Sequence, residues 1–484
     1  MGIYNGNVGN SHKALAAPAW WNWRRSCGPV RGPLDKHTLE VMRALMIIAS
    51  VAFALICSLN IQARAEVVFS EDAYRQLAEA NSADTIPVGT KITLQNWQQY
   101  KKFMPVQMQA AFSGQYSLHI GSEPMHTMEV GRAHDFPPPG DLAKNTEKYS
   151  SQVKLEQLPS GGYLVKGYVA GLPFPNPQEP NRGVKFMYNT WFFYRTGIVR
   201  NDNVGFLVDR YGNKSFTSIE AVFYGMSHLS VPGLPIDRPY ANGRLYSTRF
   251  QLQIPEQTKY TTELTELSDD PRKLPEVYVF LPSLRRSLRL SSAAKCSPIL
   301  GTDYIQDDNS WQPTNFDVKY LGHKKLLTFI GDPKKAFSKE SYVGLSEGEP
   351  ANTYPGWPKY GTGLWELRNY QVIDLAWIKS LGRYCYSHSI FYVDDQMNWA
   401  PYHDNYDNNG KLWKVFHLKW APMNYHGVTT LIYNGYAGNA MTDIENSHVS
   451  AGASYNQTLD EDVPGEYKDV EGMSSPGNLA RIMK

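Results

Sequence analysis

The sequence has few cysteines, and it lacks the short motifs that bind metals or nucleotides. It holds only four cysteines in 484 residues. It contains no H-E-x-x-H pair, no Walker loop and no dinucleotide fingerprint. Its 48 basic and 46 acidic residues nearly cancel, so the charge balance gives no indication of a nucleic-acid partner. We therefore predict no metal, no cofactor and no nucleic-acid partner.

Long apolar runs are also scarce, and the clearest one lies near the N-terminus. Met42-Arg43 precedes the apolar residues 44–59, and Ala63-Arg64-Ala65 follows them. This order is typical of a secretory signal peptide over residues 42–65, cleaved after Ala65. The run is shorter than the roughly 20 residues that a membrane span needs. We predict a periplasmic protein, with translation starting at Met42 and residues 1–41 dispensable or non-native.

Cysteine usage agrees with export. Cleavage after Ala65 removes Cys27 and Cys57 and leaves only Cys296 and Cys385 in the mature chain. Two cysteines in an exported protein favour one disulfide across a long loop. The alternative is a pair of buried free thiols.

The mature chain shows two helical patterns, followed by a long succession of strands. Ser70 begins a short predicted helix that ends near residue 81, and a second one covers 95–112, bent at Pro105. Strand patterns, with few helices between them, predict a mainly β (α+β) protein with a large antiparallel sheet. They cover 153–158, 162–169, 187–194, 205–209, 219–224, 245–254, 276–281, 319–330, 365–378, 384–393, 399–402 and 412–420.

The domain prediction is a single β-rich domain over residues 66–450. Residues 451–484 are rich in Gly, Ser, Asp and Pro and poor in large apolar groups, so we predict a flexible tail there.

The stretch 273–311 predicts a hairpin with an apolar and a basic character. A proline turn separates apolar 277–281 from 284–290, in which leucines alternate with Arg285, Ser287 and Arg289, and Arg286 breaks the pattern. One interpretation is a surface strand with solvated arginines. The other is that Arg285, Arg286 or Arg289 binds an acidic head group or the carboxylates of a partner protein.

Catalytic motifs are weak. Residues 344–348 match G-x-S-x-G, but no helix pattern follows, as a nucleophile elbow requires. Residues 405–410 resemble half of a calcium loop and are better explained as a hairpin turn. Adjacent acids such as Asp394 and Asp395 point to opposite faces of a strand and form no dyad. We therefore predict no catalytic residues.

Several blocks together resemble an exported bacterial family known as domain of unknown function 1329. The blocks are residues 170–175 with Asn189, 281–286, 301–304 with Asp307-Asp308, 365–368, and 392–394 through 410–413. The Arg-Arg and Gly-Thr-Asp order is also similar to periplasmic lipoprotein-sorting (Lol-type) carriers. The resemblance implies a curved antiparallel half-barrel, whose concave apolar face is closed by a few helices around a hydrophobic molecule.

Combining these observations, we predict a non-catalytic periplasmic carrier or chaperone for a lipid or other hydrophobic ligand, with a possible outer-membrane or efflux-type transporter partner. The candidate ligand-binding residues are Arg285, Arg286, Arg289, Trp365, Glu366 and Arg368. One alternative is a secreted hydrolase of esters or glycans, which needs groups such as Asp394, His403 and Asp404 to converge on a cleft. Another is a docking subunit of an envelope transport complex.

Overall fold

A computed structural model describes the greater part of residues 66–484. The described residues are 66–115, 128–211, 213–291, 295–299, 301–331, 353–354, 357–358, 363–432 and 436–483. The predicted leader and signal peptide, residues 1–65, and the G-x-S-x-G motif at 344–348 lie outside them. In the part of the chain that is described, no helix is both long and apolar enough to cross a membrane.

One 13-stranded sheet organises the described residues. Its spatial order is β10-β9-β8-β7-β6-β5-β21-β20-β17-β11-β14-β15-β16. The strands are β5 (Ile198–Val208), β6 (Lys214–Gly225), β7 (Arg244–Ile254), β8 (Thr262–Ser268), β9 (Glu276–Leu281), β10 (Arg286–Leu290), β11 (Phe316–Gly331), β14 (Gly363–Trp377), β15 (His388–Asp394), β16 (Tyr402–Tyr406), β17 (Leu412–Trp420), β20 (Tyr436–Asp443) and β21 (His448–Leu459). Neighbours are antiparallel except β11 and β17, which meet in parallel at the single pair Ile330 and Trp420.

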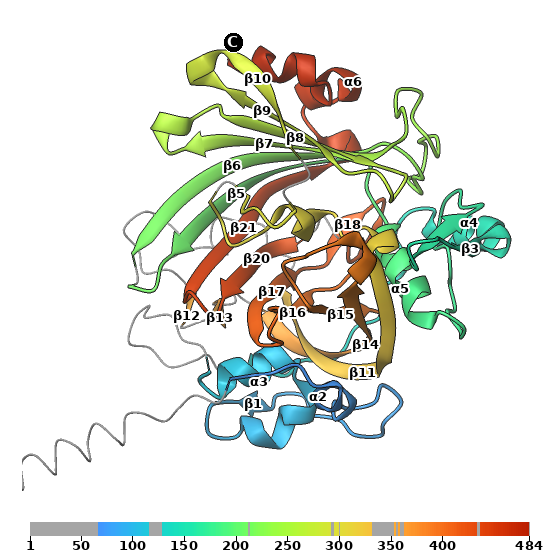
Figure 1. The fold of residues 1–484 in the computed structure, drawn as a ribbon, viewed down its shortest axis with the longest axis vertical. Helices are drawn as coiled ribbons and strands as arrows, with labels where there is room; N and C mark the ends of the chain where they lie inside the picture. Colours follow the sequence, from blue (N-terminus) through green and yellow to red (C-terminus); the bar gives the residue numbers. More distant parts are fainter. Residues whose placement is uncertain are drawn as a thin grey trace, which may run out of the picture. The chain divides into compact units, whose positions relative to one another are not determined.

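The sheet has two parts, a closed ring and an open curved arm. Strand β16 pairs with β17 as well as with β15, so β17, β16, β15, β14 and β11 close on themselves. From β20 to β10 the sheet continues as an arm that curves over the ring (Figure 1). The predicted mainly β fold with a large curved antiparallel sheet is confirmed. The closure of the ring was not predicted.

Short helices and two-stranded ribbons complete the fold. The α-helices are α2 (Glu71–Arg75), α3 (Val106–Phe112), α4 (Leu142–Tyr149), α5 (Arg182–Trp191) and α6 (Val470–Met473). The 3-10 helices are η2 (Trp97–Phe103), η3 (Ser150–Gln152), η4 (Glu256–Thr258), η5 (Pro282–Leu284), η6 (Gln306–Asn309), η7 (Pro313–Asn315), η9 (Lys379–Leu381), η11 (Asp460–Asp462), η12 (Gly465–Tyr467) and η13 (Pro476–Met483). The ribbons are β1 (Lys91–Ile92) with β2 (Met128–Glu129), β3 (Lys154–Gln157) with β4 (Tyr163–Lys166), β12 (Thr353–Tyr354) with β13 (Trp357–Pro358), and β18 (Met423–Tyr425) with β19 (Val428–Thr430).

The N-terminal helices pack on the closed ring through a buried polar hub. The Asp404 carboxylate accepts hydrogen bonds from the Tyr392 hydroxyl at 2.6 Å, the Gln107 amide at 2.9 Å and the Tyr74 hydroxyl at 3.1 Å. Burial still raises the pKa of Asp404 to about 6. Because Tyr74 and Gln107 lie in α2 and α3, this carboxylate joins both helices to β15 and β16.

The prediction of a flexible tail over residues 451–484 is wrong, because these residues begin within a strand of the sheet and continue as a packed segment. Strand β21 (His448–Leu459) lies between β20 and β5, in the middle of the sheet. Val449, Ala451 and Ala453 are buried at alternate positions, so small side chains form this strand where composition indicated a loop. Beyond it, Val470 packs with Val222 and Tyr224 of β6.

The prediction of a strand over residues 187–194 is also wrong. Their aromatic residues favour a strand, yet residues 182–191 form helix α5. Val184, Met187, Tyr188 and Trp191 are all buried, which is the spacing of a helix face. Burial of that face against the sheet outweighs the intrinsic strand preference of aromatic side chains.

Candidate functional site

A cavity of about 570 Å³ lies on the inner face of the open arm. Cross-strand partners form a row of lining residues that runs from the ring into the arm. The row is His403 (β16), Phe416 (β17), Met441 (β20), Ser450 (β21) and Leu207 (β5). Because paired residues in a sheet point to the same face, pairing alone aims all five side chains into the cavity.

A second row explains why there is room for a cavity. It consists of Leu418, Asn439, Gly452, Gly205 and Thr217, again paired from strand to strand. The two glycines lie opposite each other at its centre. They place no side chain of their own on the inner face, and a Cβ built at Gly205 would lie 2.9 Å from the Thr217 Oγ1.

The rest of the sheet wall is mainly apolar. Across β6, β7 and β8, alternate residues face the cavity, and the threonines among them contribute methyl groups as well as hydroxyls. They are Ile219, Phe223, Tyr246, Thr248, Phe250, Leu252 and Thr265. A ligand with an apolar body fits such a wall.

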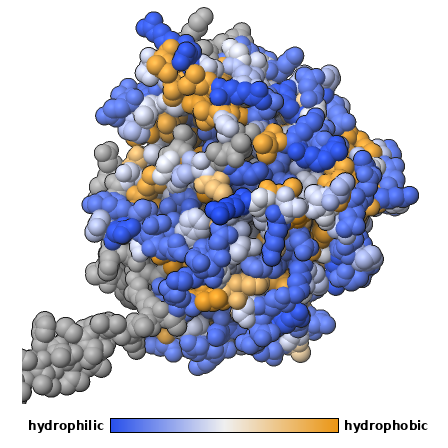
Figure 2. Space-filling model, viewed as in Figure 1, coloured by the Kyte–Doolittle hydropathy of each residue, from blue (hydrophilic) through white to orange (hydrophobic). Residues whose placement is uncertain are grey.

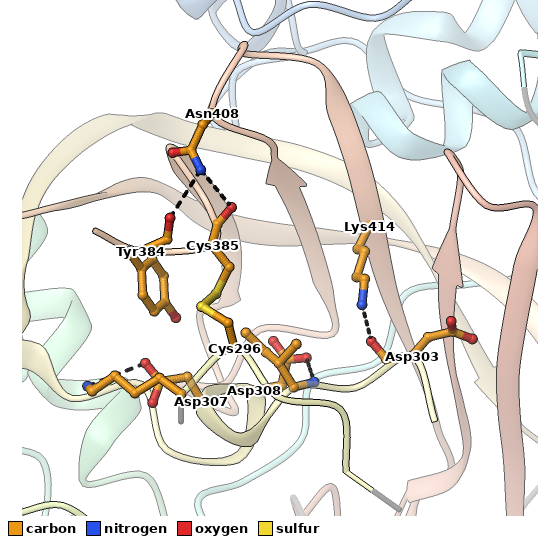
Figure 3. Close-up of a disulfide and its surroundings, with 10 residues drawn as sticks. Cys296, Asp303, Asp307, Asp308, Tyr384, Cys385, Asn408 and Lys414 are labelled. Atoms are coloured by element: carbon orange, nitrogen blue, oxygen red, sulfur yellow. Dashed lines mark hydrogen bonds and ion pairs between the residues drawn. A yellow bond between two sulfur atoms is a disulfide. The ribbon is translucent and has the colours of Figure 1, made fainter. Parts of the chain in front are cut away.

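A loop held by a disulfide covers the cavity. Cys296 and Cys385 are bonded with their Cα atoms 5.7 Å apart (Figure 3), which confirms the predicted pairing. Ile299, Thr302 and Tyr304 of this loop line the cavity.

Polar contacts fix the same loop to the sheet. The Asp303 carbonyl accepts from the Lys414 ammonium of β17 at 2.6 Å, as Figure 3 shows. The Ser450 hydroxyl of β21 donates to the Asp303 carboxylate at 2.7 Å. The Tyr304 hydroxyl donates to Asn439 of β20 at 2.9 Å. The loop is therefore attached to three strands of the cavity wall as well as to Cys385.

Three ionisable side chains other than tyrosines line the cavity among the described residues: Arg195, Asp308 and His403. The Arg195 guanidinium donates to the carbonyls of Trp191 at 2.7 Å and Phe193 at 3.3 Å. Burial raises the pKa of Asp308 to about 7 and lowers the pKa of His403 to about 3. At neutral pH the histidine is uncharged, and the carboxyl group is close to half protonated.

None of the six predicted ligand-binding residues lines this cavity. Arg285, Arg286 and Arg289 are exposed on the β9–β10 hairpin, and Arg289 forms an ion pair with Glu276 at 3.1 Å. The hairpin itself is confirmed, with Leu288 paired to Val279. Figure 2 shows apolar surface over this hairpin beside strongly hydrophilic residues, and Leu284 and Leu290 are 51% and 41% exposed.

The other three predicted residues lie on β14, in the ring. They pair with groups outside the β9–β10 hairpin, which we call the arginine hairpin. Arg368 donates to both oxygens of Asp394 at 2.7 and 3.0 Å. Glu366 contacts the His134 ring at 2.7 Å, and Trp365 is buried beside Phe329. The structure therefore keeps Trp365, Glu366 and Arg368 together but separates them from the arginines of β10.

The groups named for a hydrolase do not converge. Asp394 is paired with Arg368, whereas Asp404 faces Tyr392 and the N-terminal helices. His403, its neighbour on β16, faces the cavity. Residues 405–410 form the predicted hairpin turn, with β16 and β17 antiparallel. Among the described residues, no three His, Cys, Asp or Glu side chains are grouped to hold a metal ion.

Comparisons with known proteins find one family and several solved structures. The model of the family described as "Protein of unknown function (DUF1329)" matches residues 91–473. A putative outer membrane lipoprotein-sorting protein domain from Vibrio parahaemolyticus is 12% identical, with a TM-score of 0.41 over 61% of this chain and 99% of that chain. A DUF1329 family protein from Desulfovibrio piger is 11% identical, with a TM-score of 0.40 over 59% and 95% of the two chains.

A LolA superfamily protein from Nitrosomonas europaea is also similar. It is 12% identical, with a TM-score of 0.32 over 57% of this chain and 91% of that chain. No match is found among curated proteins.

Proposed function

We propose that this chain, which belongs to the DUF1329 family of proteins of unknown function, binds a lipid or other hydrophobic molecule and carries it within the cell envelope without catalysing a reaction. The observation that carries the proposal is the cavity of about 570 Å³ with its apolar sheet wall. Sites for small organic ligands have volumes of this size and linings of this kind.

The energetics support binding by burial alone. Placing about ten methylenes of an acyl chain against this wall contributes about 8 kcal/mol. A gain of about 8 kcal/mol corresponds to a Kd of about 1 μM before the cost of immobilising the ligand is subtracted, so micromolar binding requires a longer apolar body than ten methylenes. Binding of this strength needs no covalent step.

The disulfide supports an oxidising compartment. Structural disulfides persist in exported proteins and are rare in the reducing cytosol. Together with the signal-peptide pattern at residues 42–65, the bonded Cys296 and Cys385 support a periplasmic location.

Two measurements test the carrier function. Organic extraction of the purified protein, followed by mass spectrometry, should release a stoichiometric hydrophobic compound. The delipidated protein should enhance the fluorescence of N-phenyl-1-naphthylamine, a dye that emits in apolar cavities. A protein that yields no extract and leaves the dye dark would overturn the proposal.

The arginine hairpin favours a second candidate function, that of a docking subunit. Arg285 and Arg286 are exposed and form no ion pair with any described residue, and Leu284 is exposed beside them. A basic and apolar surface of this kind fits the carboxylates and apolar groups of an envelope transporter. In this function the arginines bind a partner, whereas the cavity binds the ligand.

A further inference from the structure

Three described residues that line the cavity each have a buried polar atom with no partner in the described part of the chain: the Tyr224 hydroxyl, Oδ1 of Asp308 and Nε2 of His403. The last two belong to the ionisable residues of the wall named above. Asp308 is 9% exposed and His403 is 3% exposed. A buried donor or acceptor that is left unsatisfied is unfavourable, and native proteins keep few of them. A ligand in the cavity that hydrogen-bonds to Asp308 and His403 would satisfy these two atoms.

Both side chains are fixed by their surroundings. The other oxygen of Asp308 accepts the backbone N–H of Ile305 at 2.8 Å, which caps η6 in the cover loop (Figure 3). The His403 ring stacks on Phe391 with centroids 3.9 Å apart and planes 8° from parallel. The ring of Phe416 packs near it at 4.8 Å. The two unpartnered atoms are therefore held in place before a ligand arrives.

The charges of the wall decide which head group fits. Arg195 is the only cation among the described lining residues, and backbone carbonyls at the end of α5 already accept from its guanidinium. Its face is covered by Phe193 and Tyr246, at 4.0 and 5.0 Å from the ring centroids. An anionic head group would meet a carboxyl group and a neutral imidazole instead of a free cation.

We infer that the cavity selects a neutral amphiphile whose hydroxyl groups hydrogen-bond to Asp308 and His403 while its apolar body lies along the sheet. This inference rests on the proposed carrier function. A hydroxyl both donates and accepts, so it complements a carboxyl oxygen and a neutral imidazole nitrogen alike. A fatty-acid carboxylate supplies acceptors only.

The electrostatic surroundings of Asp308 agree with this preference. Desolvation is the main cause of its raised pKa, the Ile305 N–H and Lys414 oppose it, and Asp307 adds to it. Tyr384 and Tyr386 are buried close enough to Asp308 for its charge to affect their pKa values. As Asp308 ionises above neutral pH, repulsion of an anionic ligand increases.

The test is a displacement assay with N-phenyl-1-naphthylamine and two competitors of equal chain length, 1-monooleoylglycerol and oleate, at pH 8. We expect 1-monooleoylglycerol to displace the dye at a concentration at least tenfold lower than oleate. Asp308→Leu and His403→Phe should each reduce the preference for 1-monooleoylglycerol over oleate about fivefold to tenfold, with dye affinity measured separately for each variant. Thr429→Val, at an exposed position of β19 outside the cavity lining, is the control.

The outcomes separate the two proposals. Equal or tighter binding of oleate, or a His403→Phe protein with unchanged selectivity, overturns the neutral-amphiphile inference and leaves the carrier function standing. A wild-type protein that binds no dye removes the carrier function itself. If Asp308→Leu fails to fold, the His403→Phe variant alone decides, because its ring keeps the stacking on Phe391.

Discussion

Removing the disulfide should destabilise the protein and loosen the cover of the cavity. Cys296 and Cys385 are 89 residues apart in the sequence. Closing a loop of this length removes unfolded-state entropy worth about 4.5 kcal/mol, and native disulfides usually contribute about 2–4 kcal/mol. We therefore expect the double variant Cys296→Ser/Cys385→Ser to lose about 3 kcal/mol in free energy of unfolding.

The effect on binding should be smaller than the effect on stability. The contacts of Asp303 and Tyr304 with Lys414, Ser450 and Asn439 still hold the cover loop when the disulfide is absent. We expect dye affinity to fall about threefold to tenfold, because a looser cover admits water. Guanidinium unfolding and dye titration, each with and without reductant, measure both quantities.

The double variant is also the control for the reductant, because reductant should destabilise the wild type and leave the stability of the variant unchanged. An identical unfolding midpoint for the two proteins would refute the bridge as a source of stability. A large loss of stability with unaltered dye affinity would refute the role of residues 295–299 and 301–309 as the cover.

Three further predictions concern the polar contacts of Asp404, the carboxyl group of Asp308 and the exposed arginines of the β9–β10 hairpin. Tyr392→Phe should lower the free energy of unfolding by about 1–3 kcal/mol, because Asp404 and the Val106 N–H both lose a partner; guanidinium unfolding measures this, and Tyr211→Phe, at a 79% exposed site, should change nothing. Because the pKa of Asp308 rises from 3.8 to about 7 on folding, the native state binds the extra proton and its stability falls as pH rises from about 4 to 7. Asp308→Asn should remove up to about 4 kcal/mol of that decline, and parallel stability curves for the two proteins would contradict it. Arg285→Glu/Arg286→Glu should abolish crosslinking to membrane-fraction transporters and leave dye binding intact; undiminished crosslinking would exclude the hairpin as the docking surface.

Sequence reasoning predicts local features of this fold well. A proline turn between two alternating runs is enough to predict the β9–β10 hairpin, and its strands pair as antiparallel neighbours. Counting the cysteines outside the predicted signal peptide and leader predicts the bonded pair. The hairpin follows from a pattern within a few neighbouring residues. The disulfide follows because only two cysteines remain to pair.

The errors arise where packing overrides local preference. Residues 182–191 form a helix because one face is buried, although their aromatics favour a strand. Strand β21 consists of small residues, so its composition indicates a loop, and only its position between β20 and β5 makes it a strand.

The cavity is the clearest case of a long-range feature. The row from His403 to Leu207 joins residues that are about two hundred positions apart, so no local window contains it. Alternation over Tyr246, Thr248 and Phe250 was a usable signal for one wall. The arginines attracted attention because charge is conspicuous in a sequence, yet they lie on an exposed hairpin.

Filling the cavity tests the central claim most directly. Thr248 is 7% exposed and faces the cavity between Phe223 and Thr265, its cross-strand partners. Thr248→Trp adds a ring that displaces roughly four methylenes of ligand, which at about 0.8 kcal/mol each weakens binding by about 3 kcal/mol, or about 100-fold. Thr429→Trp, at an exposed position of β19, is the matched control. We expect dye and lipid binding to be lost in Thr248→Trp and kept in Thr429→Trp; undiminished binding by a folded Thr248→Trp protein would show that the ligand does not occupy this cavity.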